Sequence, residues 1–168
     1  MTTIPQYASD LFERIRFTGA PVANPDSLVV TGQARFTILT PRLIRLEWSA
    51  AGQFEDRATY AFPTRYGPTP DFTAQVEAGV LTIDTGVLKL RYVEDSGWFS
   101  AGNLSIAFDF DDESHNWKPG SADPMNLRGT RRTLDVCEGD AALEEGLLSR
   151  AGWALFDDSS AVVFNHED

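Results

Sequence analysis

The chain has few of the residue types that most often build chemical sites. Cys137 is the only cysteine among 168 residues, so neither an internal disulfide nor a cluster of thiolate metal ligands can form. We interpret Cys137 as a small buried hydrophobe. His115 and His166 are the only two histidines, which leaves a serine or cysteine nucleophile short of a base. We therefore expect no metal ion.

Long apolar runs and positive charge are also scarce. No run of about 18 apolar residues, the length needed to cross a membrane, is present. Residues 1–6 lack the basic and apolar regions of a signal peptide. The 25 acidic residues outnumber the 14 basic ones, and a net charge of −11 repels phosphate backbones and anionic lipids. We expect a cytoplasmic protein that binds neither nucleic acid nor a membrane surface.

What the chain does have is an alternation of apolar and polar residues with a period of two. This alternation is typical of short, half-buried strands separated by turns. The alternating segments are 34–38, 44–48, 72–76, 81–83, 88–92 and 104–110, with further extended pieces near Leu147 and at 153–156. The pattern predicts an all-β fold, an antiparallel two-sheet β-sandwich. We expect its core to contain Phe36, Ile38, Ile44, Leu46, Leu81, Ile83, Leu88, Leu90, Ile106 and Phe108.

The length suits a single domain that spans residues 1–168. Residues 10–15 fit the start of a helix, but Ile15 and Phe17 fit an edge strand equally well. The apolar run 161–164 lies close to the last residue with no polar linker after it. It indicates either a chain cut before a following domain or a natural C-terminal strand.

Two charged clusters have structural interpretations. The acidic run 109–113 lacks the glycine and the distant glutamate of an EF-hand loop, so we expect a solvated hairpin tip. Arg128, Arg131 and Arg132 flank one glycine without the lysine of a phosphate-binding loop, so we interpret them as a buried or interfacial ion-pair node.

Asp157 and Asp158 form the most suggestive pair of carboxylates, because they follow the aromatic segment 153–156. Two carboxylates about 5–10 Å apart can perform acid–base catalysis on glycosides. Adjacent residues of a strand point to opposite faces, however. We therefore expect one of them to cap a turn with Ser159 and the other to be solvated.

Exposed tryptophans could stack on the C–H face of a sugar ring. Trp48 alternates with charged residues and is expected in the core, whereas Trp98 and Trp117 lie in turn-rich stretches.

The late part of the chain resembles a known family. The segments NLRGTRRTLD (126–135) and GLLSRAGWALFDDS (146–159) are similar to the N-terminal part of bacterial glycoside hydrolase family 31 enzymes, the α-glucosidase and α-xylosidase family. The stretches 34–49 and 54–57 agree, and the resemblance covers about residues 35–159. Arg128 stands where the family usually has glycine, and Ala151 where it usually has aspartate or asparagine.

The resemblance implies a galactose-mutarotase-like β-sandwich that precedes a catalytic (β/α)₈ barrel. The family's aspartate nucleophile and aspartate acid/base lie in that barrel, and its nucleophile motif is not found in this chain. The implied protein is the non-catalytic N-terminal domain of a retaining α-glycosidase, truncated before the barrel, with no catalytic residue of its own and no cofactor. Its implied partners are the barrel of the same parent chain and the parent's carbohydrate substrate. Trp153, Asp157 and Asp158 are the residues expected to line the substrate pocket.

Two other functions stay open. A free-standing carbohydrate-binding β-sandwich module would expose tryptophans and bind sugars without a barrel. A mutarotase-type epimerase would need His115 and His166 to meet in one cleft. A domain separated from its barrel should expose an apolar patch, which we expect at 147–156 and 162–164 and which predicts a homo-oligomer.

Overall fold

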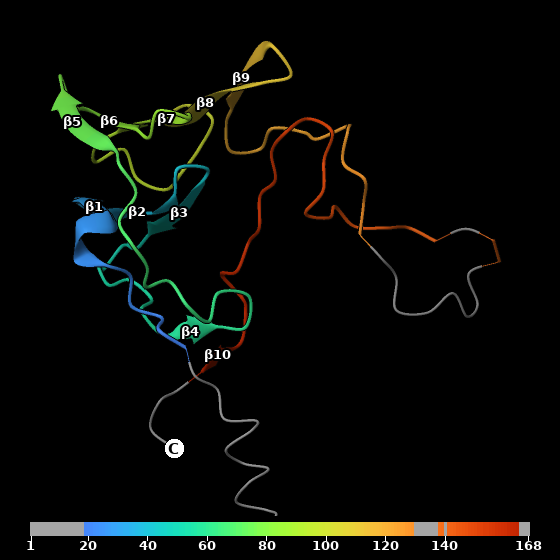
Figure 1. The fold of residues 1–168 in the computed structure, drawn as a ribbon, viewed down its shortest axis with the longest axis horizontal. Coiled ribbons are helices and arrows are strands. Elements are labelled where there is room, and N and C mark those ends of the chain that lie inside the picture. Colours follow the sequence, from blue (N-terminus) through green and yellow to red (C-terminus); the bar gives the residue numbers. More distant parts are fainter. Residues whose placement is uncertain (1–18, 130–137, 140, 165–168) are drawn as a thin grey trace, which may run out of the picture.

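The computed structural model describes residues 19–129, 138–139 and 141–164 (Figure 1). One sheet has three strands in the order β1-β2-β3, formed by Leu28–Thr31, Ala34–Thr40 and Leu43–Trp48. A five-stranded sheet consists of β5 (Thr73–Glu77), β6 (Val80–Asp84), β7 (Leu88–Val93), β8 (Leu104–Phe110) and β9 (Glu113–Trp117). A small third sheet pairs β4 (Ala58–Thr59) with β10 (Val163–Phe164). Every pair is antiparallel.

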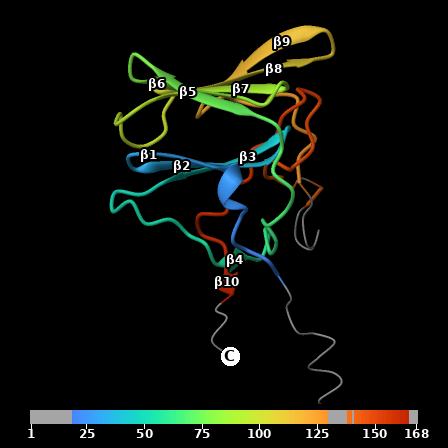
Figure 2. The ribbon, with the colours of Figure 1, turned by 60° about the vertical axis from the view of Figure 1, so that its left-hand side comes forward.

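The three-stranded and five-stranded sheets lie face to face, and the β4–β10 pair lies below the three-stranded sheet (Figure 2). Phe36 and Ile38 from β2 contact the same core as Ile83 from β6 and Leu90 from β7. The fold is therefore the all-β, antiparallel two-sheet sandwich that the alternation predicts. The only helix among the described residues is the 3₁₀ turn η1 (Pro25–Ser27), and none is long and apolar enough to span a membrane.

Local sequence explains the hairpins. Ala78 and Gly79 join β5 to β6 with φ values of 50° and 76°, the backbone of a type I′ two-residue turn. Asp111 and Asp112 do the same between β8 and β9, with φ values of 54° and 61°. Both aspartates are exposed, so the acidic run forms the hairpin tip that the sequence predicts.

The predicted core is largely confirmed. Phe36, Ile38, Leu81, Ile83 and Leu90 are buried. Ile44, Leu46, Leu88, Ile106 and Phe108 are half-buried, because they line the side of the sandwich where the three-stranded sheet ends. The core also includes Ala34, Tyr92 and Leu104, which share the same alternation.

Two sequence expectations are wrong. Trp117 is the last residue of β9, not part of a turn-rich connection, and it is half-buried opposite Ile106. The segment 153–156 belongs to no strand. The reason is that no described backbone hydrogen bond reaches residues 152–157, so the alternating side chains have no paired backbone to support them. Residues 10–17, where helix and strand were both open, lie outside the described part of the chain.

Candidate functional site

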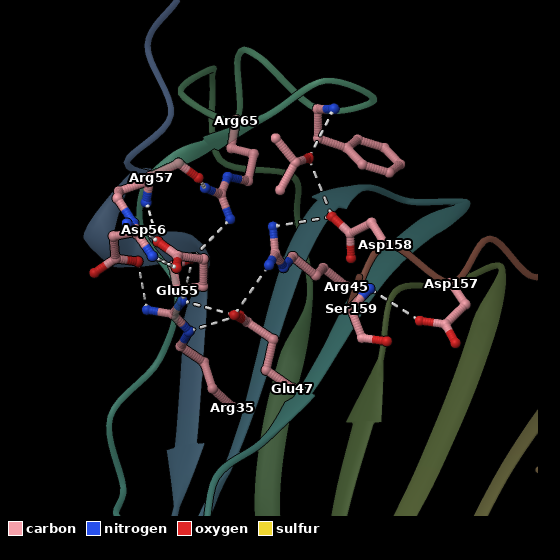
Figure 3. Close-up of polar contacts among 12 residues, drawn as sticks. Arg35, Arg45, Glu47, Glu55, Asp56, Arg57, Arg65, Asp157, Asp158 and Ser159 are labelled. Carbon is pink, nitrogen blue, oxygen red and sulfur yellow. Dashed lines mark hydrogen bonds and ion pairs between the residues drawn. The ribbon is translucent and has the colours of Figure 1, made fainter. Parts of the chain in front are cut away.

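A network of charged side chains covers the face of the three-stranded sheet that points away from the core (Figure 3). Alternation along the strands decides its composition. Phe36 on β2 and Leu46 on β3 point into the core, so Arg35, Arg45 and Glu47 point to the other face. The loop 54–65, which includes the two-residue strand β4, and the C-terminal residues 157–159 supply the remaining members.

Arg35 is the centre of the network. Its Nε donates to Glu47 Oε2 at 2.8 Å and its Nη1 donates to Asp56 Oδ1 at 2.7 Å. Its guanidinium also lies 4.8 Å from the centre of the Phe54 ring, a cation–π distance. Burial lowers the pKa of Arg35, but Glu47 and Asp56 outweigh burial and raise this pKa above its ordinary value. Arg35 therefore stays charged and joins the sheet to the loop.

Arg65 ties the same loop to itself. It donates to the carbonyl oxygen of Glu55 at 2.9 Å and to that of Arg57. Burial, and then the positive charge of Arg45, lower the pKa of Arg65. The Nε atoms of Arg45 and Arg65 are buried without a hydrogen-bond partner among the described residues.

The structure separates the two adjacent aspartates. Asp157 is exposed and accepts a hydrogen bond from the Ser159 backbone N–H at 2.9 Å, which confirms the expected turn cap. Hydrogen bonds from Ser159 lower the pKa of Asp157. The expectation that the other aspartate is solvated is wrong. Asp158 is half-buried, 3.7 Å from Arg45 Nη1, and accepts from Thr59 Oγ1 at 3.2 Å.

Trp153 lies elsewhere, at a cavity of about 340 Å³ beside the open edge of β3. Its ring centre is 6.2 Å from that of Trp117, and the buried Nε1 of Trp117 has no described hydrogen-bond partner. Hydrophobic side chains form most of the lining, and Arg42 and Asp109 are its charged members. Because Asp158 lies on the opposite face of β3, the three residues expected at one pocket do not converge.

The two segments that carry the family resemblance hold each other in place. Asn126 accepts from the Gly146 N–H at 2.8 Å and donates back to the Gly146 carbonyl at 3.0 Å. A Cβ on Gly146 would lie 2.6 Å from the carbonyl oxygen of Arg128, so only glycine fits there. Leu127 N–H donates to Leu148 O at 2.9 Å. The motif residues thus form a backbone clasp, which sequence reasoning did not foresee.

A buried aspartate supports this clasp. Asp123 accepts from Ser149 Oγ at 2.8 Å and from Asn126 Nδ2 at 3.0 Å. Burial raises the pKa of Asp123, but the hydrogen bonds from Asn126 and Ser149 outweigh it and hold the pKa below its ordinary value. The one sign of this role in the sequence is that Asp123 precedes Pro124 in a turn-rich stretch. A buried aspartate needs hydrogen-bond donors close to it in space.

The remaining candidate residues have few interaction partners or lie outside the described residues. Arg128 is exposed and lies 4.0 Å from Glu145, so this pair is a weak surface contact and not a buried ion-pair node. Arg131 and Arg132 lie outside the described residues. His115 stacks on Phe108 with ring centres 5.2 Å apart. His166 and Cys137 also lie outside the described residues. Within the described part of the chain, no three His, Cys, Asp or Glu side chains gather as metal ligands.

No protein-family model matches this chain, and no curated protein matches it significantly. The family resemblance therefore rests on the motif residues themselves.

Proposed function

We propose that this chain is the non-catalytic, galactose-mutarotase-like sandwich domain of a retaining α-glycosidase that acts on α-glucosides or α-xylosides. The two-sheet fold is compatible with this role, and the motif residues lie in the clasp between 126–129 and 146–149. The chemistry belongs to two carboxylates of a barrel outside these residues. Asp157 and Asp158 are engaged with Ser159 and Arg45, which suits support of the domain rather than catalysis.

The observation that carries the proposal is the apolar surface around the clasp. Met125, Leu127, Leu143, Leu147 and Leu148, in and beside the clasp segments, are large exposed apolar side chains, and Leu155, Phe156 and Val162 are further ones along the C-terminal segment. Soluble monomeric domains seldom leave contiguous apolar surface of more than a few hundred Å² uncovered. A barrel packed on this side would cover these residues and remove them from water.

The coding sequence that follows Asp168 gives the first test. We expect it to encode a barrel with the family's Trp-x-Asp-Met-Asn-Glu-like nucleophile motif. The second test is activity on aryl α-glucosides and α-xylosides. We expect none from the purified 168-residue chain and turnover from the polypeptide that includes the barrel. Turnover by the 168-residue chain alone would overturn the proposal.

A carbohydrate-binding module is the second candidate, and Trp98 favours it. Its side chain is 65% exposed and its ring packs edge-on against Trp48 at 5.8 Å. A supported, exposed indole is a suitable platform for a pyranose ring. Titration with methyl α-D-glucopyranoside, followed by tryptophan fluorescence, would show saturable binding that W98A abolishes. The glycosidase-domain proposal expects no binding at Trp98.

A further inference from the structure

The two main sheets of the sandwich do not match in width. Five strands face three, so β8 and β9 extend past β3 and their inner side chains have no sheet opposite them (Figures 1 and 2). Phe108 and Trp117 on these strands border the cavity instead. Strands in a sheet lie about 4.8 Å apart, so the overhang has room for further strands beside β3.

The exposed edge of β3 has free backbone groups. Ser49 N–H donates to Gln33 O at 2.9 Å, and the register pairs Arg35 with Glu47. Because hydrogen-bonded pairs alternate along an antiparallel ladder, Arg45 and Glu47 bond to β2. Ile44 and Leu46 therefore direct their N–H and C=O groups away from β2. No described segment accepts or donates there.

The opposite wall of the cavity is also unpaired. Leu43, Ile44 and Leu46 line one side, and residues 153–155 line another. Residues 152–157 make no backbone hydrogen bond within the described chain, although 153–156 has the sequence of a strand. Two unpaired backbone edges thus border one apolar cavity.

We infer that a further β-strand, supplied by the same polypeptide from outside these 168 residues, inserts between β3 and residues 153–156. With this strand the smaller sheet has five members, namely β1, β2, β3, the inserted strand and 153–156, which equals the five-stranded sheet opposite. The inference rests on the proposed function for its source, a longer parent chain. It makes the segment 153–156 part of a completed sandwich.

Charge specifies the chemistry of the strand. Its inner side chains face Phe108 and Trp117 and are apolar. Its outer side chains lie next to Arg45, since directly opposed residues on neighbouring strands have Cβ atoms about 4.5–5.5 Å apart. The Nε and Nη1 atoms of Arg45 are buried with no hydrogen-bond partner in the described chain, and Asp158 is 3.7 Å from Nη1. We therefore expect a carboxylate or amide oxygen of the inserted strand to bond to Arg45.

Residue-resolved amide hydrogen exchange tests the inference on the 168-residue chain and on the complete natural polypeptide. We expect the amides of Ile44 and Leu46 to exchange fast in the 168-residue chain and to become at least tenfold slower in the complete polypeptide. The amides of Arg45 and Glu47 bond to β2 and are internal controls that are protected in both. Equal exchange of Ile44 and Leu46 in both proteins overturns the inference, as does a natural polypeptide that ends at Asp168.

Protection of Ile44 and Leu46 already present in the 168-residue chain also overturns it. Protection that grows with protein concentration would identify a second copy as the occupant, and concentration-independent protection would identify the chain's own residues. Glycosidase activity is measured separately, so that the two proposals can be distinguished. Slowed exchange in a complete polypeptide without turnover would support the strand insertion and reject the proposed function.

Proline variants give an independent readout. Adjacent amides of a strand point to opposite sides, so one of A154P and L155P removes a donor to the inserted strand. We expect both variants to leave the Tm of the 168-residue chain unchanged, because neither amide is bonded there. One of them should lower the Tm of the complete polypeptide by several degrees. The matched control A142P, at an exposed position outside any strand, should lower neither. Unchanged Tm values for both variants in the complete polypeptide would contradict the inserted strand.

Discussion

Asp157 and Asp158 show how far two adjacent, identical side chains can diverge in role. Asp157 bonds within its own turn, whereas Asp158 joins the C-terminal segment to Arg45 on β3 and to Thr59 on β4. The side chains of Arg45 and Asp158 are only 13% and 18% exposed, so water screens this ion pair less than a surface pair. The stabilising role therefore belongs to Asp158.

Replacing each aspartate in turn tests this assignment. D158A removes the acceptor of Thr59 and one anion beside Arg45, and we expect it to lower the free energy of unfolding by about 1–3 kcal/mol. D157A, the matched control, removes an exposed turn cap and should cost about 1 kcal/mol or less. Urea denaturation measures both. Equal losses for the two variants would mean that Asp158 has no special place in the network.

Glu55 makes the stability of the fold depend on pH in the acidic range. Hydrogen bonds from the Arg57 side chain lower the pKa of Glu55 to about 2, against an ordinary value of 4.5. A carboxyl whose pKa is lower in the folded state stabilises the fold fully above the unfolded pKa. This contribution is therefore present above about pH 4.5 and is lost as the pH falls towards 2.

The variant R57M should raise the pKa of Glu55 towards 4.5, as measured by NMR titration of its side-chain carboxyl. It should also remove the part of the acid sensitivity that belongs to Glu55. The control K89M removes a cation beside Asp84 and should leave the Glu55 titration unchanged. A Glu55 pKa that stays near 2 in R57M would show that the Arg57 side chain is not the cause.

At the scale of elements, the segment 152–156 is positioned by side-chain packing without a backbone ladder. Trp153 packs against Trp117, and Phe156 packs edge-on against Phe62 with ring centres 5.8 Å apart. Gly152 lies directly on the Phe110 ring of β8, where a Cβ would be 2.3 Å from Phe110 Cγ. Glycine is needed here for the close approach and for a φ of +76°.

Two glycine variants separate the steric clash from the backbone strain. Both G152A and G52A place alanine at a left-handed φ, which costs roughly 1–2 kcal/mol. G52A has open space around its new Cβ, whereas G152A also has to displace the Phe110 ring. We expect G152A to lower the free energy of unfolding by at least 1 kcal/mol more than G52A, and to change the fluorescence of Trp153. Equal losses would mean that Phe110 moves aside freely.

At the scale of the whole molecule, a strongly acidic chain exposes several large apolar side chains along its C-terminal segment 147–162. Leu147, Leu148, Leu155, Phe156 and Val162 are all exposed, as the sequence predicts for 147–156 and for the start of 162–164. Without a partner over it, such a surface drives association. A net charge of −11 opposes that association, and added salt screens the repulsion.

We therefore expect the 168-residue chain to self-associate as its concentration and the salt concentration rise, as measured by light scattering. L148E replaces a leucine that is 70% exposed and should weaken association at least tenfold. The control V76E introduces the same charge at an exposed valine of β5 and should leave association unchanged. A wild-type chain that stays strictly monomeric at high concentration would contradict this prediction.

The sequence by itself determined the fold class and most of the core, because a period of two assigns each side chain of a strand to one face. Phe36 and Ile38 had to share a face, and Arg35 and Thr37 had to share the other. It also determined the acidic tip at Asp111 and Asp112, since that turn is set by neighbouring residues alone.

Only the tertiary structure decided which faces meet and which edges are paired. The sequence does not show that Asp158 reaches Arg45, which is more than 100 residues earlier in the chain, or that Asn126 closes on Gly146. It also predicted a strand at 153–156, because the alternation is there. Backbone pairing, however, needs a neighbouring edge, and the neighbour of these residues across the cavity is a β3 edge that they do not reach. A strand forms only when its backbone is hydrogen-bonded to a neighbouring segment, and the sequence of one segment does not show whether that neighbour is in reach.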